Sequence, residues 1–133
     1  MYVAMRDPAA PAHIVRDVSR TLEDNSYRWT YRRPELQFWV EGARRVRFAM
    51  SFALAETTMK ATGPVTLSFF VNGQRFDAAR YDQPGNHEYE KDVPAELLKP
   101  RAKNVVAIEP DQVWVSPDGV AMGFVLTEAG FKY

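Results

Sequence analysis

The segment from Arg45 to Leu54 constrains the fold more than any other part of the sequence. Apolar residues occupy every second position in it: Val46, Phe48, Met50, Phe52 and Leu54. A helix would place Phe48 and Phe52 on one side and Met50 on the other, whereas a strand places all five on one face. The segment therefore predicts a β-strand with one buried face.

The opposite face of the same segment changes character along its length. Arg45 and Arg47 are followed by Ala49, Ser51 and Ala53. Charged side chains stay in water, whereas small ones allow other groups to lie over the sheet. We therefore predict an outer face that becomes partly covered toward the C-terminal end of the strand.

A second strong signal is Asn72-Gly73, which separates two further strand-like segments. Both central residues of a type I′ turn need positive φ, and Asn-Gly is the pair that most often supplies it. We therefore predict an antiparallel hairpin made of Val65–Val71 and Gln74–Tyr81.

Turn residues divide the rest of the chain into short apolar or alternating segments. We expect strands at residues 13–18, 27–31, 36–40, 87–93, 104–109 and 120–127. Val120, Met122, Phe124 and Leu126 are expected on one face of the last of these. The segment 104–109 is almost entirely apolar, which is typical of a central strand.

The remaining segments are expected to separate these strands. Pro34 is expected to end the strand at 27–31, residues 56–64 to form a loop, and residues 94–98 to form one helical turn. Prolines at 8 and 11 predict an extended N-terminal arm over residues 1–12. The whole pattern predicts an all-β chain of 1–133 that forms one antiparallel β-sandwich domain of the jelly-roll kind.

Composition excludes several classes of function. Lys+Arg and Asp+Glu both number 17, and a neutral chain is a poor partner for nucleic acid or an anionic membrane surface. There is no cysteine, which excludes disulfides, thiolate zinc sites and a cysteine nucleophile. No apolar segment approaches the roughly 20 residues of a membrane helix, so we expect no membrane insertion.

Several of these segments follow one another in a familiar order. Phe70-Val71-Asn72-Gly73 is followed by Tyr89–Pro94, Leu97-Leu98 and Asn104–Ile108, and Met122–Leu126 comes last. Over residues 35–127 the chain resembles the galactose-binding-like jelly rolls, which occur as accessory, carbohydrate-binding-module-like domains of bacterial glycosidases and envelope proteins. Those domains often have Gly before the Asn of the third segment, where this chain has Lys103.

The resemblance implies a non-catalytic module that binds carbohydrate or supports a neighbouring protein domain. It also implies a periplasmic or secreted location if the chain is part of a larger envelope protein. Two alternatives stay open from the residues: a purely structural or protein-interaction domain, and a small glycoside hydrolase.

Four aromatic residues are the candidate ligand-binding residues, because a flat ring stacks well on the C–H face of a sugar. Trp39 lies out of register with Leu36 and Phe38, although it could instead pack under a loop or the N-terminal arm. Trp29 and Tyr31 belong to an alternating aromatic stripe that begins at Tyr27, and such a stripe is also typical of a core. Trp114 lies in a proline-bounded loop, where it could bind a ligand or cover the core.

Evidence for a metal or for catalysis is sparse. His13 and His87 have no second ligand at close spacing, and a structural calcium ion on Asp111 and Asp118 is conceivable on chemical grounds. Glu88 and Glu90 share one strand face but have the pattern of solvated charges. No nucleophile elbow or phosphate loop is present, so we predict no cofactor and no enzymatic activity.

Overall fold

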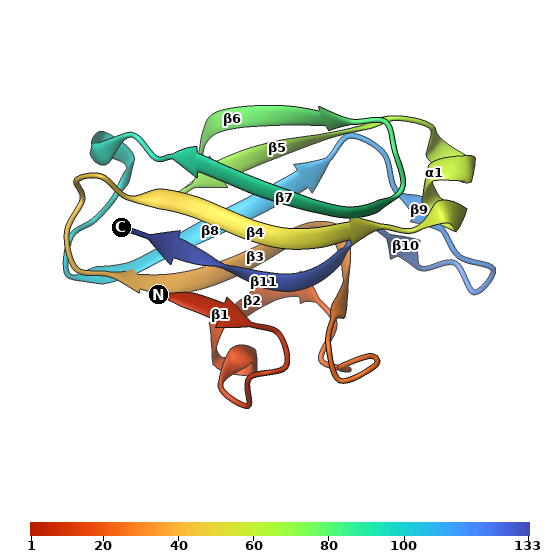
Figure 1. Ribbon diagram of the computed structural model, residues 1–133, viewed down its shortest axis with the longest axis horizontal. Coiled ribbons are helices and arrows are strands. Elements are labelled where there is room, and N and C mark those ends of the chain that lie inside the picture. The colour runs from red at the N-terminus through yellow and green to blue at the C-terminus, as the bar shows by residue number, and fades with distance from the viewer.

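The computed structural model describes residues 1–133 and consists of two layers of antiparallel strands (Figure 1). The first layer, sheet A, contains in order β7 (Gly85–Asp92), β4 (Arg47–Leu54), β11 (Val125–Lys132) and β1 (Tyr2–Ala4). The second layer, sheet B, contains β6 (Gln74–Tyr81), β5 (Val65–Val71), β8 (Ala102–Pro110), β3 (Arg28–Val40) and β2 (Ile14–Val18). The predicted all-β, antiparallel sandwich is confirmed.

Short elements close the two ends of the sandwich. At one end, here called the α1 end, lie α1 (Glu56–Thr62) and the paired strands β9 (Trp114–Val115) and β10 (Ala121–Met122) (Figure 1). At the other, the η2 end, lies the 3-10 turn η2 (Ala95–Leu97). A second 3-10 turn, η1 (Ala10–His13), precedes β2. No helix has the length and apolar character needed to cross a membrane.

The core lies between the two sheets and follows the predicted alternation. On β4, Phe48, Met50 and Phe52 are at most 1% exposed, and β5 contributes Leu67 and Phe69 from the opposite sheet. These residues belong to one cluster of 26 buried residues. The outer face of β4 also follows the prediction, since Ala49 is buried and Ser51 is half-buried.

The strand β3 is longer than predicted, because Pro34 lies within it and does not end it. Before the proline, Trp29 is paired with Val125 of β11 in sheet A. After it, Glu35 is paired with Ala107 of β8 in sheet B. Proline has no N–H to donate to a ladder, so it is tolerated at the point where one neighbouring strand is exchanged for another. The single strand β3 thus joins the two layers.

The predicted hairpin is confirmed, with positive φ at both turn residues, 50° at Asn72 and 85° at Gly73. The Asn72 side chain holds the η2 end together by donating from Nδ2 to Asn104 Oδ1 at 2.8 Å and to Leu97 O at 2.8 Å. Its Oδ1 accepts the N–H of Val105. β8 lies between β3 and β5, which confirms that the apolar segment at 104–109 is central.

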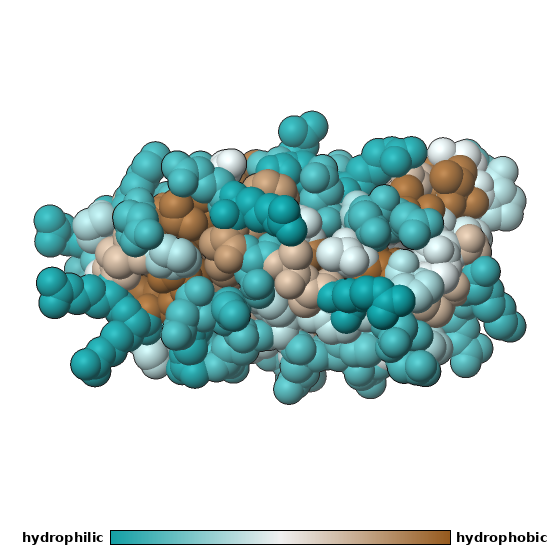
Figure 2. All heavy atoms as spheres, turned by 90° about the horizontal axis from the view of Figure 1, so that it is seen from above, coloured by the Kyte–Doolittle hydropathy of each residue, from teal (hydrophilic) through white to brown (hydrophobic).

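The strands β6 and β7 are edge strands of the two sheets and are not paired with each other. Side chains, not backbone hydrogen bonds, therefore close this side of the sandwich. The Tyr89 ring stacks on Phe69 with centroids 3.7 Å apart, and its hydroxyl donates to Asp77 Oδ2 at 2.7 Å. Figure 2 looks onto this side and shows mainly hydrophilic side chains, with hydrophobic areas toward both ends. Tyr89 and Asp77 thus connect the edge strands of the two sheets.

Two further expectations about local structure are wrong. Residues 56–62 form α1 instead of a loop, although no side chain caps the helix at Ala55. The expected strand at 120–127 is divided at Gly123, which leaves Val120 exposed and Met122 half-buried.

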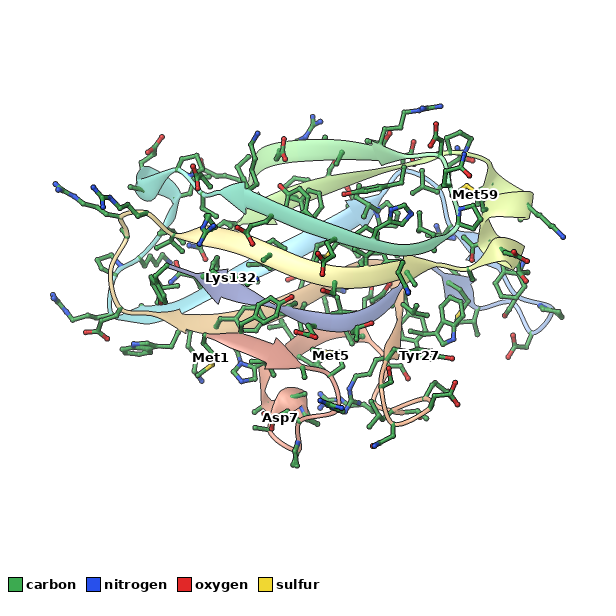
Figure 3. The ribbon with its side chains drawn as sticks, viewed as in Figure 1. Met1, Met5, Asp7, Tyr27, Met59 and Lys132 are labelled. Carbon is green, nitrogen blue, oxygen red and sulfur yellow. The ribbon has the colours of Figure 1, made fainter.

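The first twelve residues contain β1 and most of η1 where an extended arm was expected. β1 pairs with β11, and the N–H of Met5 donates to Thr127 O at 2.8 Å. Figure 3 shows Met1 and Met5 at the two ends of β1 and Asp7 in the loop beyond it. The N-terminal segment is therefore held by backbone hydrogen bonds, which its side-chain pattern does not encode.

Candidate functional site

The largest surface depression lies on the outer face of sheet B near the α1 end and has a volume of about 380 Å³. We call it the β3–β8 hollow. Seven residues line it, of which all but Pro110 and Val113 are polar: Arg32, Ser68, Glu109, Pro110, Asp111, Gln112 and Val113. The volume falls within the range of small-molecule binding sites.

The hollow exists because β3 separates from β8. Pairing between the two strands stops at Glu35 and Ala107, so the last residues of β8, Ile108–Pro110, pair only with β5. On the other side of Pro34, β3 continues toward β11. Arg32 is thus left across an open space from Glu109, and the space is the hollow.

Hydrogen-bonding groups in the hollow are partly committed and partly available. Asp111 is fixed in place, because its Oδ1 accepts the N–H of Thr66 at 2.9 Å and its own N–H donates to Thr66 O at 3.0 Å. Arg32 and Glu109 take part in none of the ion pairs of the structure. The hollow therefore presents a guanidinium donor and carboxylate acceptors to whatever enters it.

Trp114 follows the last lining residue, Val113, and is half-buried. It pairs with Met122 in the β9–β10 ladder, and the next residue, Gly123, donates its N–H to Thr30 O at 2.9 Å. This places Trp114 at the same end of the molecule as the first half of β3. Whether Trp114 contacts a ligand stays a prediction.

Trp29 and Tyr31 are half-buried, and the interpretation of their stripe as core is wrong. The alternate residues Arg28 and Thr30 are buried instead, at 5% and 0% exposure. Thr30 Oγ1 both donates to Phe124 O at 2.7 Å and accepts its N–H at 3.0 Å. Because such partners satisfy these polar groups, burial costs little, and the aromatic rings remain on the outer face.

The Arg28 guanidinium is buried among backbone carbonyls. It donates to Met5 O at 3.2 Å, to Ser19 O at 3.2 Å and to Arg20 O at 2.8 Å. Desolvation, followed by repulsion from the Arg20 charge, lowers the pKa of Arg28 from its usual value. These three bonds fix the N-terminal segment and the loop between β2 and β3.

Trp39 lies far from the other candidates. It is eight residues beyond Tyr31 on the same strand, which corresponds to about 26 Å. It is 46% exposed, and its Nε1–H donates to Glu41 Oε2 at 3.0 Å. The alternative that a loop or the N-terminal arm covers Trp39 is therefore wrong, and Trp39 cannot share one sugar platform with Trp114.

Metal ligands are not gathered anywhere in the chain. No group of three or more His, Cys, Asp or Glu side chains is placed to hold a metal ion. Of the two proposed calcium ligands, Asp111 holds the start of β5 and Asp118 accepts a hydrogen bond from the Ser116 hydroxyl. His13 and His87 each stack on a phenylalanine and contact a backbone carbonyl oxygen.

Sequence comparison gives no relative: no protein-family profile matches the chain, and no curated protein matches it significantly. Solved structures do match. A family 35 carbohydrate-binding module from Clostridium thermocellum superposes with a TM-score of 0.53 at 11% identity, covering 98% of this chain and 97% of the module.

Two larger proteins contain a similar domain. An acetyl xylan esterase from the rumen bacterium Butyrivibrio proteoclasticus matches with a TM-score of 0.55 at 12% identity over 100% of this chain, but this chain spans only 32% of the esterase. A family GH115 4-O-methyl-α-glucuronidase matches with a TM-score of 0.53 at 6% identity, over 99% of this chain and 17% of its own length. At these identities the comparisons establish the fold, which is the predicted carbohydrate-binding-module-like jelly roll.

Proposed function

We propose that this chain is a non-catalytic module that binds carbohydrate in the β3–β8 hollow. The observation that carries the proposal is the mostly polar lining of the hollow, in a fold that matches a carbohydrate-binding module over nearly its whole length. Sugar hydroxyls both donate and accept hydrogen bonds. The hollow offers acceptors on Glu109 and Asp111, donors on Arg32, and both on Ser68 and Gln112.

Charge-assisted hydrogen bonds make this lining more effective than neutral groups would be, since they are roughly twice as strong as neutral ones. Trp114 follows the lining residue Val113 in the chain, and we propose that its apolar ring contacts the C–H face of the sugar. Trp29 and Tyr31 belong to the same strand as Arg32 but alternate with it, so their contact with the same ligand stays a prediction.

The arrangement of the carboxylates favours binding over hydrolysis. A glycoside hydrolase needs two carboxyl groups that face each other across the scissile bond. Glu109 and Asp111 instead come from one strand end, and one oxygen of Asp111 is already bonded to the Thr66 N–H. The proposal therefore assigns the hollow to recognition without chemistry.

Calorimetry with xylohexaose, cellohexaose and mannohexaose tests the proposal. At least one of these probes should bind the wild-type chain, and Ser68→Tyr, which fills the hollow, should remove that binding. Gln74→Tyr adds the same ring at an exposed position on β6 and serves as the matched control. Failure of the wild type to bind any of the probes would contradict the proposal, as would full binding by Ser68→Tyr.

A protein-interaction role is the second candidate, and the exposure of two apolar residues on sheet B favours it. Val15 on the edge strand β2 is 43% exposed and Trp39 is 46% exposed. Exposed edges and apolar side chains are typical of contact surfaces. Sedimentation velocity distinguishes this role: it predicts concentration-dependent association that Trp39→Ser weakens, whereas a monomer at all concentrations counts against it.

A further inference from the structure

The outer face of sheet A carries a continuous groove, opposite the face that holds the β3–β8 hollow. Three depressions of about 150, 330 and 180 Å³ adjoin there. The first two share Ser51 and Glu88, and the last two share Ser26 and Thr127. We call their union the sheet-A groove. It extends from Lys132 toward the loop that precedes Tyr27 (Figure 3).

Small residues form the floor of the sheet-A groove. Ala49 and Ser51 of β4 line the groove. On β11, Gly130 lies opposite Ala49 and lets the β1 backbone approach closely, since a Cβ there would lie 2.1 Å from Met1 O. Tyr2 of β1 borders the groove on one side and Glu88 of β7 on the other. The change from arginine to small residues along β4 thus creates the space.

An irregularity in β11 adds polar groups to the groove. The register with β4 shifts between Leu126 and Glu128, so Thr127 is an extra residue. A bulge of this kind turns side chains that would alternate onto the same face. Thr127 and Glu128 consequently both line the groove. From Thr127 to Lys132 the strand spans about 17 Å, enough for several linked sugar rings.

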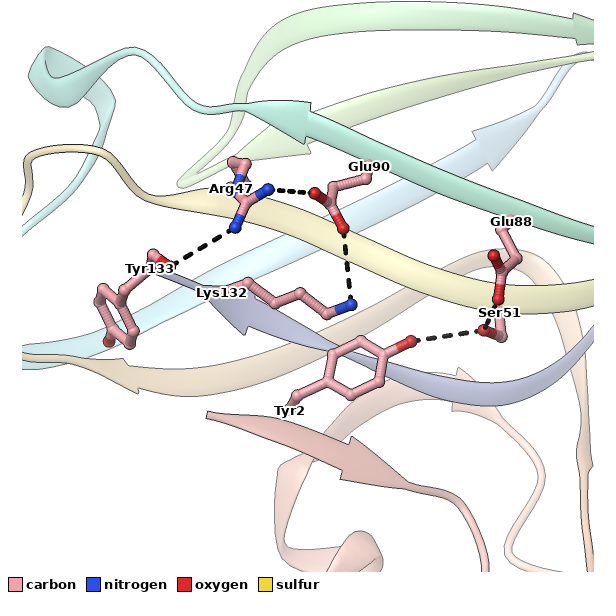
Figure 4. A network of polar contacts seen from close by, with 7 residues as sticks. All are labelled: Tyr2, Arg47, Ser51, Glu88, Glu90, Lys132 and Tyr133. Atoms are coloured by element: carbon pink, nitrogen blue, oxygen red, sulfur yellow. Dashed lines mark hydrogen bonds and ion pairs between the residues drawn. The ribbon is translucent and has the colours of Figure 1, made fainter.

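The charges of the groove are only partly neutralised within the chain (Figure 4). Glu90 is paired with Arg47 and, at 3.5 Å, with Lys132. Arg6 also lines the groove and is unpaired, so the lining carries three carboxylates, Glu88, Glu90 and Glu128, against two cations, Arg6 and Lys132, and is net negative. Glu88 and Glu128 belong to no ion pair of the structure. These two residues flank Ser51, since both are its register partners, one from β7 and one from β11.

Hydroxyl groups accompany the carboxylates. Ser51 Oγ donates to Glu88 Oε1 at 3.3 Å and lies 3.4 Å from the Tyr2 hydroxyl (Figure 4). These are long contacts, which a ligand hydroxyl could replace with shorter ones. Unpaired carboxylates accept hydrogen bonds from hydroxyls strongly and repel anionic ligands.

We propose that the sheet-A groove is a second glycan-binding site, selective for uncharged glycans over uronate-containing ones. This inference rests on the proposed carbohydrate-binding function and extends it. Ser68 of the hollow and Ser51 of the groove point outward from opposite sheets, so one molecule would bind two separate glycan chains.

Calorimetric stoichiometry with the three neutral hexasaccharides tests this inference. The wild type should bind two molecules of a neutral hexasaccharide, and Ser68→Tyr should bind one. Ser51→Tyr, which fills the groove, should also bind one, and the double variant should bind none. Glu88→Ala is a second variant of the groove that adds no bulk. It should weaken the affinity of the groove for the neutral hexasaccharide about tenfold or more. Hexagalacturonate should not compete for the site that remains in Ser68→Tyr.

The outcomes separate the two proposals. If the wild type binds one hexasaccharide and Ser68→Tyr binds none, the groove is refuted and the hollow stands. If Ser51→Tyr alone abolishes binding, the groove stands and the hollow is refuted. Equal binding of neutral and uronate probes by Ser68→Tyr overturns the selectivity, and absence of all binding to the wild type overturns both sites. Unchanged thermal unfolding of the variants is the control for folding.

Discussion

Removal of the Asn104 side chain should destabilise the protein strongly, because this side chain is fully buried and bonds to three other residues. Its Oδ1 accepts from Asn72 Nδ2 and from the Lys99 N–H, each at 2.8 Å. Its Nδ2 donates to Lys99 O at 2.9 Å and to Ala102 O at 3.1 Å. The bond from Asn72 connects the segment that follows η2 to the hairpin turn, and the other three hold residues 99–104 of that segment in their own turn.

Asn104→Ala leaves the Lys99 N–H and two carbonyls without these partners. At about 1 kcal/mol net for each bond, and allowing for partial rescue by water, the free energy of unfolding should fall by about 3 kcal/mol. For a chain of this length that corresponds to a melting temperature lower by about 10 °C.

Urea unfolding at equilibrium measures this loss, with an unchanged m-value as evidence that both end states are preserved. Lys103→Ala, at the exposed neighbouring position, is the matched control and should change the free energy of unfolding by less than about 0.5 kcal/mol. A loss below about 1 kcal/mol for Asn104→Ala would refute the account of the η2 end.

Two further substitutions test the packing. Gly123→Ala should lower the free energy of unfolding by about 1–3 kcal/mol, because the new Cβ would lie 2.9 Å from Tyr31 O. Gly42→Ala has open space around it and should be nearly neutral. Thermal unfolding compares the two variants. Burial, with the hydrogen bond to Asp77, raises the pKa of Tyr89 above its usual value of 10.0. The neutral phenol therefore stabilises the fold fully below pH 10 and progressively less above it. Thermal unfolding midpoints measured between pH 9 and 11 should fall more steeply for the wild type than for Tyr89→Phe. Parallel pH profiles of the two proteins would contradict this.

Local patterns predicted much of the fold. The alternation over β4 and the Asn72-Gly73 turn depend on neighbours in sequence, and both are confirmed. The predictions failed where contacts between residues distant in sequence determine the local structure. Pro34 is tolerated in β3 only because the partner strand changes there, and Arg28 is buried only because carbonyls from separate segments receive its donors.

The candidate site was predictable only in part. Trp114 was singled out as a loop residue, whereas the structure places it in β9, directly after the last lining residue of the hollow. Arg32 and Glu109 carried no local signal, because they meet only where β3 separates from β8. In the sheet-A groove, the small residues of β4 were noticed in the sequence, but the bulge at Thr127 depends on pairing with another strand.

The central claim is that the β3–β8 hollow binds carbohydrate, and amide chemical-shift mapping tests it most directly. Titration with the hexasaccharide that binds best in calorimetry should shift the amides of Ser68, Glu109, Asp111 and the Trp114 indole N–H, in a saturable way. Gln74, on an exposed part of β6, should remain unchanged. Saturable shifts that leave all four hollow signals in place would contradict the assignment of binding to this hollow.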